Sequence, residues 1–397
     1  MDIQKTVDSV DEAYILELRH ELHRFPELEF DLPKTLAIVR RELDGMGIPY
    51  TEQYGKSSIV AFLNPDCSGF SIGLRADMDA LPLTEKTGLP FSSEHPGIMH
   101  ACGHDAHTAM LLGTAKALKA VEKELACRVV LIFQACEENM PGGAEALVRD
   151  GAADLCDVIV GQHVENWLES GTAGICPGAS MAACDPLHIE FFGKTAHATL
   201  PQSGINALAM AVETYEGINR FLATRMDPFE KYVCSVGMLR AGHTHNVIPA
   251  YAEMKISLRT FSLETRDYMI DNIRQIAENA AGSRGGSMVF HDDGHCPPLV
   301  NHPGVSARVL KSAAAVLGED RITGMPVKLS SEDFSFYGTR RPSAFLRLGT
   351  RNEAKGCVTL PHNNDFLLDE AALASGSRIL TRFVLDHMAG FDPESEE

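Results

Sequence analysis

The sequence predicts an α/β fold in which a mostly parallel sheet is flanked by helices and interrupted by an inserted α+β domain. The length of 397 residues exceeds what one small core usually organises, and it favours two domains. Apolar strand-like runs alternate with helical patterns in the first and last parts of the chain, which is the order of a parallel sheet with right-handed crossovers. The intervening part has the order β-α-β-β-α-β, which is typical of a ferredoxin-like arrangement.

The first part of the chain supplies the opening elements of this sheet. Two amphipathic helices are expected between residues 11 and 47, with a break at Phe25-Pro26. Apolar runs predict strands, and the β-branched run at 128–133 is typical of a strand buried on both faces. The predicted strands are 58–63, 71–76, 128–133 and 158–160, with an Ala- and Leu-rich helix over 109–118 and another helix opened by Gly142-Gly143-Ala144.

The middle and the end of the chain follow two different patterns. Alternating apolar and polar residues at 187–192 are typical of a half-buried antiparallel strand. The inserted domain is expected to continue with a helix over 205–224, strands at 232–239 and 250–260, a helix over 264–281 and a strand at 287–291. The chain then returns to the first domain with a helix over 305–317, a strand at 344–348 and a closing helix over 369–387.

Composition excludes several classes of partner. The 54 acidic residues outnumber the 35 basic ones, for a formal net charge of −19, and no long basic run offsets them. Such a surface argues against nucleic acid and anionic membranes as partners, although it says nothing about a small substrate in a local cleft. No apolar run approaches the roughly 18 residues that span a bilayer, and the amino-terminal residues lack the apolar core of a signal peptide.

The cysteines point to a reducing compartment. Ten cysteines are scattered without CxxC pairs in a chain that carries no export signal, so a disulfide framework is not expected. We therefore predict a cytoplasmic protein.

The segment from His100 to Thr108 carries the strongest chemical signal. It holds three imidazoles, a thiol and a carboxylate, followed at once by the predicted helix over 109–118. Cys102 and His104 are two residues apart at the start of that helix, and thiolate plus neutral imidazole is a donor set suited to zinc and other first-row divalent ions. The alternative is a buried structural cysteine beside polar histidines, so the interpretation depends on further ligands.

Those further ligands are expected at one edge of the sheet. Ligands of parallel α/β sheets gather beyond the carboxyl ends of the strands. Three successive predicted strands end at that edge, and they deliver Asp77 and Asp79, Glu137 and Glu138, and His163. Any one acidic strand end is more often a solvated loop, but the convergence of three favours a site.

The candidate ligands are too many for one closed structural site. A single tetrahedral ion needs four ligands, whereas five suit two ions that share bridging groups. These five are Cys102, His104, Glu138, His163 and His362. Glu137 and Glu138 leave the chain in different directions, so one can bind a metal while Glu137 acts as the general base toward water. A solvated acidic loop is the alternative for this pair.

Several motifs then resemble a known family. The sequence Arg75-Ala76-Asp77-Met78-Asp79-Ala80-Leu81-Pro82, the Cys102/His104 cluster, Glu137-Glu138 before Gly142-Gly143-Ala144, Asn246-Val247-Ile248-Pro249 and Ser331-Glu332-Asp333-Phe334-Ser335 resemble the aminoacylase/carboxypeptidase family of co-catalytic metallohydrolases. Within it, the chain is similar to the branch of hippurate hydrolases, plant auxin-conjugate hydrolases and bacterial N-acyl-amino-acid amidohydrolases. The resemblance extends from about Glu21 to Ala372.

The resemblance implies a role for each candidate residue. Residues 1–184 and 295–397 would form the catalytic domain, and 185–294 an inserted lid and dimerisation domain. The five ligands would bind two divalent ions, Zn²⁺ or Mn²⁺ with Co²⁺ or Ni²⁺ as alternatives, and no other cofactor is expected. Asp79 would orient the base or a ligand. His197 would stabilise the oxyanion, in dimeric relatives from the neighbouring subunit. Asn246 and Arg259 would hold the substrate carboxylate.

The function implied is hydrolysis of the amide bond of an N-acyl or N-aroyl amino acid or a related conjugate, by attack of metal-bound hydroxide. The chain departs from the branch at Glu165-Asn166-Trp167, at Ala135-Cys136 and at Gln202, which leaves the acyl and amino-acid pockets open. A dipeptidase or carboxypeptidase is the alternative within the family. A catalytically silent, metal-stabilised protein that binds acyl-amino acids is the alternative outside it, and a homodimer or higher oligomer through the lid is expected as an assembly. A nucleotide-binding enzyme is disfavoured, because no Gly-rich phosphate loop follows a strand.

Overall fold

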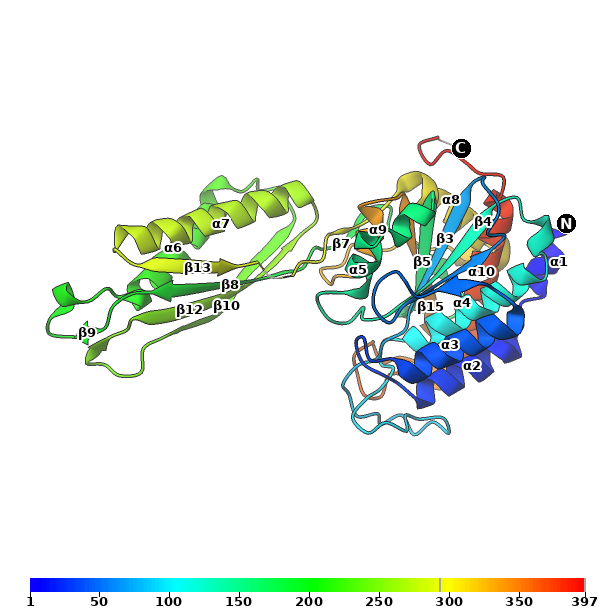
Figure 1. The fold of residues 1–397 in the computed structure, drawn as a ribbon, viewed down its shortest axis with the longest axis horizontal. Helices are drawn as coiled ribbons and strands as arrows, with labels where there is room; N and C mark the ends of the chain where they lie inside the picture. Colours follow the sequence, from blue (N-terminus) through cyan, green and yellow to red (C-terminus); the bar gives the residue numbers. More distant parts are fainter. Residues whose placement is uncertain (293, 396–397) are drawn as a thin grey trace. The chain divides into compact units, whose positions relative to one another are not determined.

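The computed structural model describes residues 1–292 and 294–395, and the chain divides into two compact units (Figure 1). Unit 1 comprises Met1–Ser180, Val300–Val327 and Asp333–Glu397, and unit 2 comprises Met181–Leu299 and Lys328–Glu332. The last two residues of the predicted second catalytic segment, Glu396 and Glu397, lie outside the described residues, as does Asp293 near the end of the predicted lid.

Unit 1 is built on a seven-stranded sheet with the order β1-β2-β4-β3-β5-β15-β6. The four central strands β4, β3, β5 and β15 are parallel to one another, and β1, β2 and β6 each pair antiparallel with their neighbours at the edges. The predicted α/β class is therefore confirmed. The strands span Tyr50–Thr51 (β1), Ile59–Leu63 (β2), Ser71–Asp77 (β3), Arg128–Gln134 (β4), Val158–Glu169 (β5), Ala173–Gly174 (β6) and Ser343–Arg351 (β15).

Strand β5 is longer than the sequence predicts. The apolar run ends at Val160, but the strand continues to Glu169 because β15 pairs with it in parallel from Ile159 to Glu165 and again at Glu169. His163 therefore lies inside a paired strand and not in the loop beyond it. The pairing fixes the backbone on both sides of this side chain, which a loop position would not do.

The helices of unit 1 bury the sheet. Helix α4 (His104–Lys119) packs against β3 and β5, and both α2 (Glu12–Arg24) and α10 (Leu373–His387) pack against α4. Helix α3 (Pro33–Met46) starts with proline in its first turn and ends at Gly47 in the left-handed conformation, which are favoured start and stop residues. The remaining helices are α1 (Ile3–Asp8), α5 (Gly143–Arg149), α8 (Pro303–Leu317) and α9 (Ser335–Gly338).

Unit 2 is an antiparallel sheet with the order β10-β12-β8-β13 and two helices. Its elements follow the chain order β8 (Asp185–Phe192), α6 (Ala207–Arg225), β10 (Tyr232–Ala241), β12 (Tyr251–Thr260), α7 (Leu263–Ser283) and β13 (Ser287–His291). Leu187, Ile189 and Phe191 alternate toward a separate hydrophobic core with the two helices. A short ribbon of β9 (Ala196–His197) and β11 (Val247–Ile248) completes the unit. Strands β7 (Gly178–Met181) and β14 (Leu299–Asn301) form a separate two-stranded sheet.

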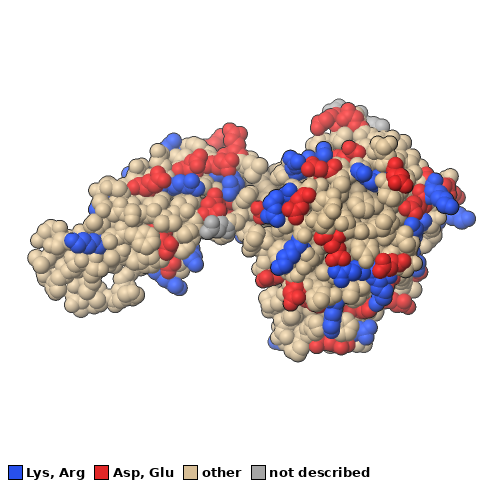
Figure 2. All heavy atoms as spheres, viewed as in Figure 1, with Lys and Arg blue, Asp and Glu red and all other residues tan. Residues whose placement is uncertain are grey.

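The charged side chains are mixed on the surface, and the helices are those of a chain without long apolar runs. Acidic and basic side chains are interspersed on the face shown in Figure 2, so on this face the negative charge is spread and not gathered in one place. Among the described residues, no helix has both the length and the apolar character needed to cross a bilayer.

Candidate metal centre

Two of the predicted ligands come from the turn into helix α4. Cys102 lies in the loop just before the helix, and His104 is its first residue. Gly103 between them has φ +89°, and a Cβ atom there would lie 2.4 Å from Cγ2 of Val164. Both the backbone conformation and the close approach to β5 therefore require glycine at this position. This glycine is what brings the thiol and the imidazole against the strand that carries His163.

The glutamate pair is held by a second turn, at the end of β4. After Gln134, Cys136 has φ +54° and turns the chain sharply, so that Glu137 and Glu138 leave the edge of the sheet. Gly143 then donates its N–H to the Cys136 carbonyl at 2.8 Å, and a Cβ atom on Gly143 would lie 1.8 Å from the Ala135 carbonyl oxygen. The Gly142-Gly143 motif thus allows helix α5 to start against the turn that carries the glutamates.

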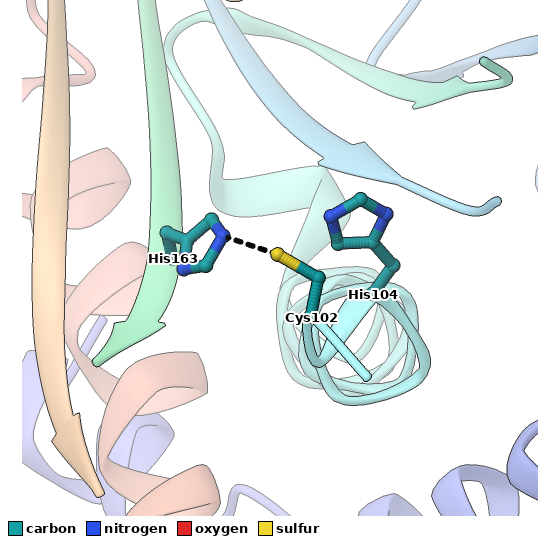
Figure 3. Close-up of side chains that lie close together, drawn as sticks. All are labelled: Cys102, His104 and His163. Atoms are coloured by element: carbon teal, nitrogen blue, oxygen red, sulfur yellow. Dashed lines mark hydrogen bonds between the residues drawn. The ribbon is translucent and has the colours of Figure 1, made fainter. Parts of the chain in front are cut away.

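Figure 3 shows three of the predicted ligands side by side, with His163 extending from β5 toward the start of α4. Sγ of Cys102 lies 3.4 Å from Nε2 of His163. His362 comes from a distant loop, where its N–H donates to the Ala101 carbonyl at 2.8 Å. Its Nε2 lies 3.3 Å from Oε2 of Glu138. The structure therefore brings all five residues together within unit 1.

The ligand atoms form two groups that share one residue. Cys102, His104 and His163 offer atoms that lie within 4.8 Å of one another, and so do Cys102, Glu138 and His362. Nε2 of His104 is 3.8 Å from Oε1 of Glu138, which links the two groups. Ligand atoms around one tetrahedral ion with bonds of about 2.1 Å are separated by about 3.4 Å. The separations of 3.4 Å between Cys102 Sγ and His163 Nε2 and of 3.3 Å between His362 Nε2 and Glu138 Oε2 are close to this value, one in each group.

Unsatisfied buried atoms support the same fit. Nε2 of His104 and Oε1 of Glu138 are buried and have no hydrogen-bond partner among the described residues. Leaving such atoms unpaired in a protein interior is costly. The Nδ1 atoms of His104 and His163 face carbonyl oxygens of Asp79 and Val164 at 2.9 and 2.5 Å. Since a carbonyl can only accept, each Nδ1 carries the proton and each Nε2 presents its lone pair to the site.

The electrostatics of the cluster suit the exchange of protons for cations. Burial raises the pKa of the Cys102 thiol, and the charges of Glu138 and Glu137 raise it further. Burial lowers the pKa of His104, but the carboxylates of Asp77 and Asp79 outweigh burial and raise it to about 10. These protons are held by a surplus of nearby negative charge, which a divalent cation would neutralise while displacing them.

Asp79 connects the two turns. It is buried, with 1 % of its surface exposed, and its two carboxylate oxygens accept the backbone N–H groups of Glu137 at 2.9 Å and Glu138 at 3.1 Å. Its own carbonyl oxygen holds His104. One residue thus fixes the backbone of the glutamate pair and the ring of a histidine. Glu137 in turn places Oε2 3.9 Å from Nε2 of His104, and its Oε1 accepts the Asp333 N–H at 3.4 Å.

The other three predicted residues lie in unit 2, and the structure brings only two of them together. His197 pairs with Val247 across the β9–β11 ribbon, and the Asn246 carbonyl accepts the Ala198 N–H at 3.0 Å. His197 and Asn246 are therefore neighbours on an exposed loop pair. Arg259 is near the far end of β12, where its guanidinium is 3.4 Å from the Ser331 hydroxyl. It is eight residue steps along the strand from Tyr251, which is about 27 Å of extended chain.

A buried polar network beneath the cluster was not assigned any role from the sequence. Asp77 accepts hydrogen bonds from Arg75 and His107, and Arg75 and Gln134 both bind Asp333, which belongs to the Ser331–Ser335 motif. Burial raises the pKa of Asp77, but the charges of His104 and Arg75 outweigh burial and hold this pKa well below its ordinary value. The signal available in the sequence was the spacing of His104 and His107, which places both on one face of a helix.

The chain is similar to proteins of one known family. Residues 73–386 match the profile of Peptidase family M20/M25/M40. The chain is 37 % identical over 301 residues to an N-acyl-L-amino acid amidohydrolase of Geobacillus stearothermophilus, covering 76 % of this chain and 81 % of the relative. It is 33 % identical over 370 residues to thermostable carboxypeptidase 1 of Saccharolobus solfataricus, covering 92 % and 93 %.

A solved structure agrees with these matches. The YxeP protein of Bacillus subtilis, described as a dinuclear metal binding peptidase from the M20 family, superposes with a TM-score of 0.80 at 31 % identity. The match covers 94 % of this chain and 98 % of that protein. The agreement therefore extends over both units of the chain.

Proposed function

The chain belongs to Peptidase family M20/M25/M40, a family of metal-dependent hydrolases of amide bonds, and we propose that it cleaves the amide bond of N-acyl or N-aroyl amino acids. The observation that carries this proposal is the pair of ligand groups that share Cys102 at the edge of the parallel sheet. We assign the catalytic role to unit 1 and a lid role to unit 2.

The ligand groups suggest how two cations are held. One would be bound by Cys102, His104 and His163, and the other by Cys102, Glu138 and His362, with the thiolate shared. Zn²⁺ and Mn²⁺ are the ions we propose, with Co²⁺ and Ni²⁺ as alternatives. When bound, such a pair polarises the scissile carbonyl and lowers the pKa of water.

Glu137 is proposed as the residue that moves the proton. Its carboxylate faces the same space as His104 Nε2 and Glu138 Oε1, yet Glu137 belongs to neither of the two groups that share Cys102. It would take a proton from the attacking water and donate it to the leaving amine. Asp79 supports this role because it holds the backbone N–H of Glu137 and that of Glu138.

The residues of unit 2 are proposed to act in two different sites. His197 would stabilise the oxyanion and Asn246 would bind the substrate carboxylate, while Arg259 would bind the carboxylate from the other end of the sheet. An amino-acid derivative cannot span the roughly 27 Å of strand that separates Tyr251 from Arg259. We therefore propose a homodimer, in which His197 and Asn246 of one copy complete the site that contains Arg259 of the other copy.

A second candidate function comes from the likeness to a carboxypeptidase. Because a carboxypeptidase and an N-acyl-L-amino acid amidohydrolase are both more than 30 % identical to this chain, the acyl group is the point to test. The substrates to compare are acetyl, benzoyl and aminoacyl derivatives of the same amino acid, together with a blocked dipeptide, at matched concentration and with measured metal content. Preference for the acetyl or benzoyl compounds supports the proposal, whereas preference for the dipeptides supports the second candidate.

The same preparation tests the dependence on metal. Removal of the ions with a chelator is expected to abolish hydrolysis, and adding back Zn²⁺ or Mn²⁺ to restore it. Recovery distinguishes lost occupancy from damage to the protein. A metal-replete protein that binds N-acyl amino acids without cleaving them would refute the proposed activity and favour a binding protein.

A further inference from the structure

His107 lies directly behind the candidate metal centre but belongs to neither ligand group that shares Cys102. It is on helix α4 one turn after His104, and only 1 % of its surface is exposed. Its ring centroid lies 4.5 Å from that of His163. A buried imidazole this close to a proposed ligand has either a metal-binding role of its own or a supporting one.

The hydrogen bonds of His107 decide between these roles. The backbone N–H of Val164 lies 2.9 Å from Nε2, and because an N–H group can only donate, Nε2 must be the unprotonated acceptor. The proton is therefore on Nδ1, which donates to Oδ1 of Asp77 at 2.6 Å. Both ring nitrogens are occupied, so no lone pair is left for a cation. His107 and Asp77 do form a group with His104 that could be mistaken for a metal site.

The carboxylate that holds His107 is itself fixed. Oδ2 of Asp77 accepts a hydrogen bond from Arg75 at 2.5 Å, and both side chains are fully buried. Asp77 therefore directs Oδ1 toward His107 with little freedom to turn. This arrangement fixes the tautomer and the orientation of the imidazole, as a carboxylate behind a histidine commonly does.

Val164 transmits this order to His163. Its N–H is held by His107, and its carbonyl oxygen accepts the proton of His163 Nδ1 at 2.5 Å. The same residue also closes against Gly103, where no side chain would fit. The position of Val164 thus sets which nitrogen of His163 is protonated and directs its Nε2 toward Sγ of Cys102.

We infer that His107 is a positioning residue for the cation bound by Cys102, His104 and His163, acting through Asp77 on one side and Val164 on the other. The inference rests on the proposed function, because it needs the two cations. Loss of the His107 hydrogen bonds is expected to lower the affinity for that cation selectively, by about 10–100-fold, as for other residues that orient metal ligands. The affinity for the cation at Glu138 and His362 is expected to change less.

Three variants test the inference. His107→Phe keeps a ring of similar size but removes both hydrogen bonds. His107→Gln keeps one donor and one acceptor, so it is expected to restore most of the affinity. Asp77→Asn places an amide N–H opposite Nδ1, which forces the other tautomer and sets two N–H groups against each other at Val164. Thr114→Val is the matched control, because it removes from the same helix a buried hydroxyl that, within the described part of the chain, bonds the carbonyls of Met110 and Ser377.

The measurement is metal content per chain and the affinity of each ion, from competition of the full-length protein with a chromophoric chelator. The absorption spectrum of the Co²⁺-loaded protein gives a second readout that does not depend on activity. We expect two ions in the wild type, in Thr114→Val and in His107→Gln, and one tight ion in His107→Phe and Asp77→Asn. Should His107→Phe fail to fold, the isosteric Asp77→Asn still decides the question.

The outcomes separate the two hypotheses. A wild-type protein that binds no ions refutes the proposed function, and the inference with it. A wild-type protein that binds two ions, together with His107→Phe or Asp77→Asn variants that bind both as tightly, refutes the inference alone. Equal weakening by Thr114→Val would likewise refute it, because the effect would then be a general loosening of α4.

Discussion

Replacement of Glu137 by glutamine separates proton transfer from metal binding. The side chain keeps its size, and its oxygen can still accept the Asp333 N–H, a bond that is already long at 3.4 Å. The backbone N–H of residue 137 keeps its bond to Asp79. A structural cost of about 1 kcal/mol is therefore expected, since the long hydrogen bond from Asp333 loses its charged acceptor but keeps an oxygen to accept it.

The expected effect on turnover is much larger. Glutamine cannot take a proton from water at neutral pH, and removal of a general base typically costs 10²–10⁴-fold. We expect a decrease in kcat of about 10³-fold, which corresponds to about 4 kcal/mol at 1.36 kcal/mol for each factor of ten. The assay is steady-state hydrolysis of an N-acyl amino acid at saturating metal, with metal content measured on the same sample.

Glu138→Gln is the matched comparison, since it changes the adjacent carboxylate. Glu138 contacts His362 and His104, and it belongs to a ligand group with Cys102. This variant should lose metal as well as activity, whereas Glu137→Gln should keep the metal. Near-normal turnover in Glu137→Gln, or equal loss of metal in both variants, would show that the roles of the two glutamates are assigned wrongly.

Three further predictions concern the backbone, pH and assembly. Gly103→Ala should lower the free energy of unfolding in denaturant by about 2–5 kcal/mol, because it adds both the strain of a positive φ and overpacking against Val164. Gly97→Ala, with φ +84° and nothing within 4 Å, should cost only the strain of the positive φ. Equal losses of stability in the two variants would contradict the argument. Burial lowers the pKa of His23, but Asp105 outweighs burial and raises the pKa above 6.5. Protonated His23 therefore contributes to the stability of the fold below pH 6.5, and this contribution is lost as pH rises through the folded pKa. The pKa of its partner Glu85 is lowered from 4.5 to about 2, because the hydrogen bonds of His23 and Ser93 outweigh burial. The stability that ionised Glu85 contributes is therefore present above pH 4.5 and lost toward pH 2. The stability difference between the wild type and His23→Gln should therefore be largest between pH 4.5 and 6.5, and a difference that does not vary with pH would contradict this. Finally, a mixture of the inactive variants His197→Ala and Arg259→Ala should recover about a quarter of wild-type activity if each dimer site draws on both copies, and none if one copy supplies both residues.

The meeting of the candidate ligands at one place could be predicted because it depends on topology. Strands that run parallel bring their carboxyl ends to one edge, so the sequence predicts that Glu138 and the Cys102–His104 turn lie close together. The position of His362 could not be derived in this way. It reaches the site because its backbone N–H binds Ala101, a contact between loops far apart in the chain that no local pattern records.

The supporting residues were harder to predict, because their roles depend on hydrogen-bond direction. Asp77 and His107 are visible in the sequence as a strand end and as a second histidine on a helix face. What they do depends on the N–H of Val164, a backbone group that every residue except proline carries. The sequence predicts the end of β5 too early for a related reason. The apolar run stops at Val160, but pairing with β15 extends the strand past His163.

The separation of His197 from Arg259 follows from elementary strand geometry. The sequence predicts an extended strand over 250–260, and an extended chain advances about 3.3 Å for each residue. A residue at the start of that strand and one at its end therefore cannot contact the two ends of a small substrate in the same copy. In dimeric relatives, the resemblance already implies that the imidazole at the position of His197 comes from the neighbouring subunit. The length of β12 is an independent argument for the same assignment, and we therefore propose that His197 and Arg259 of one chain act in two different sites.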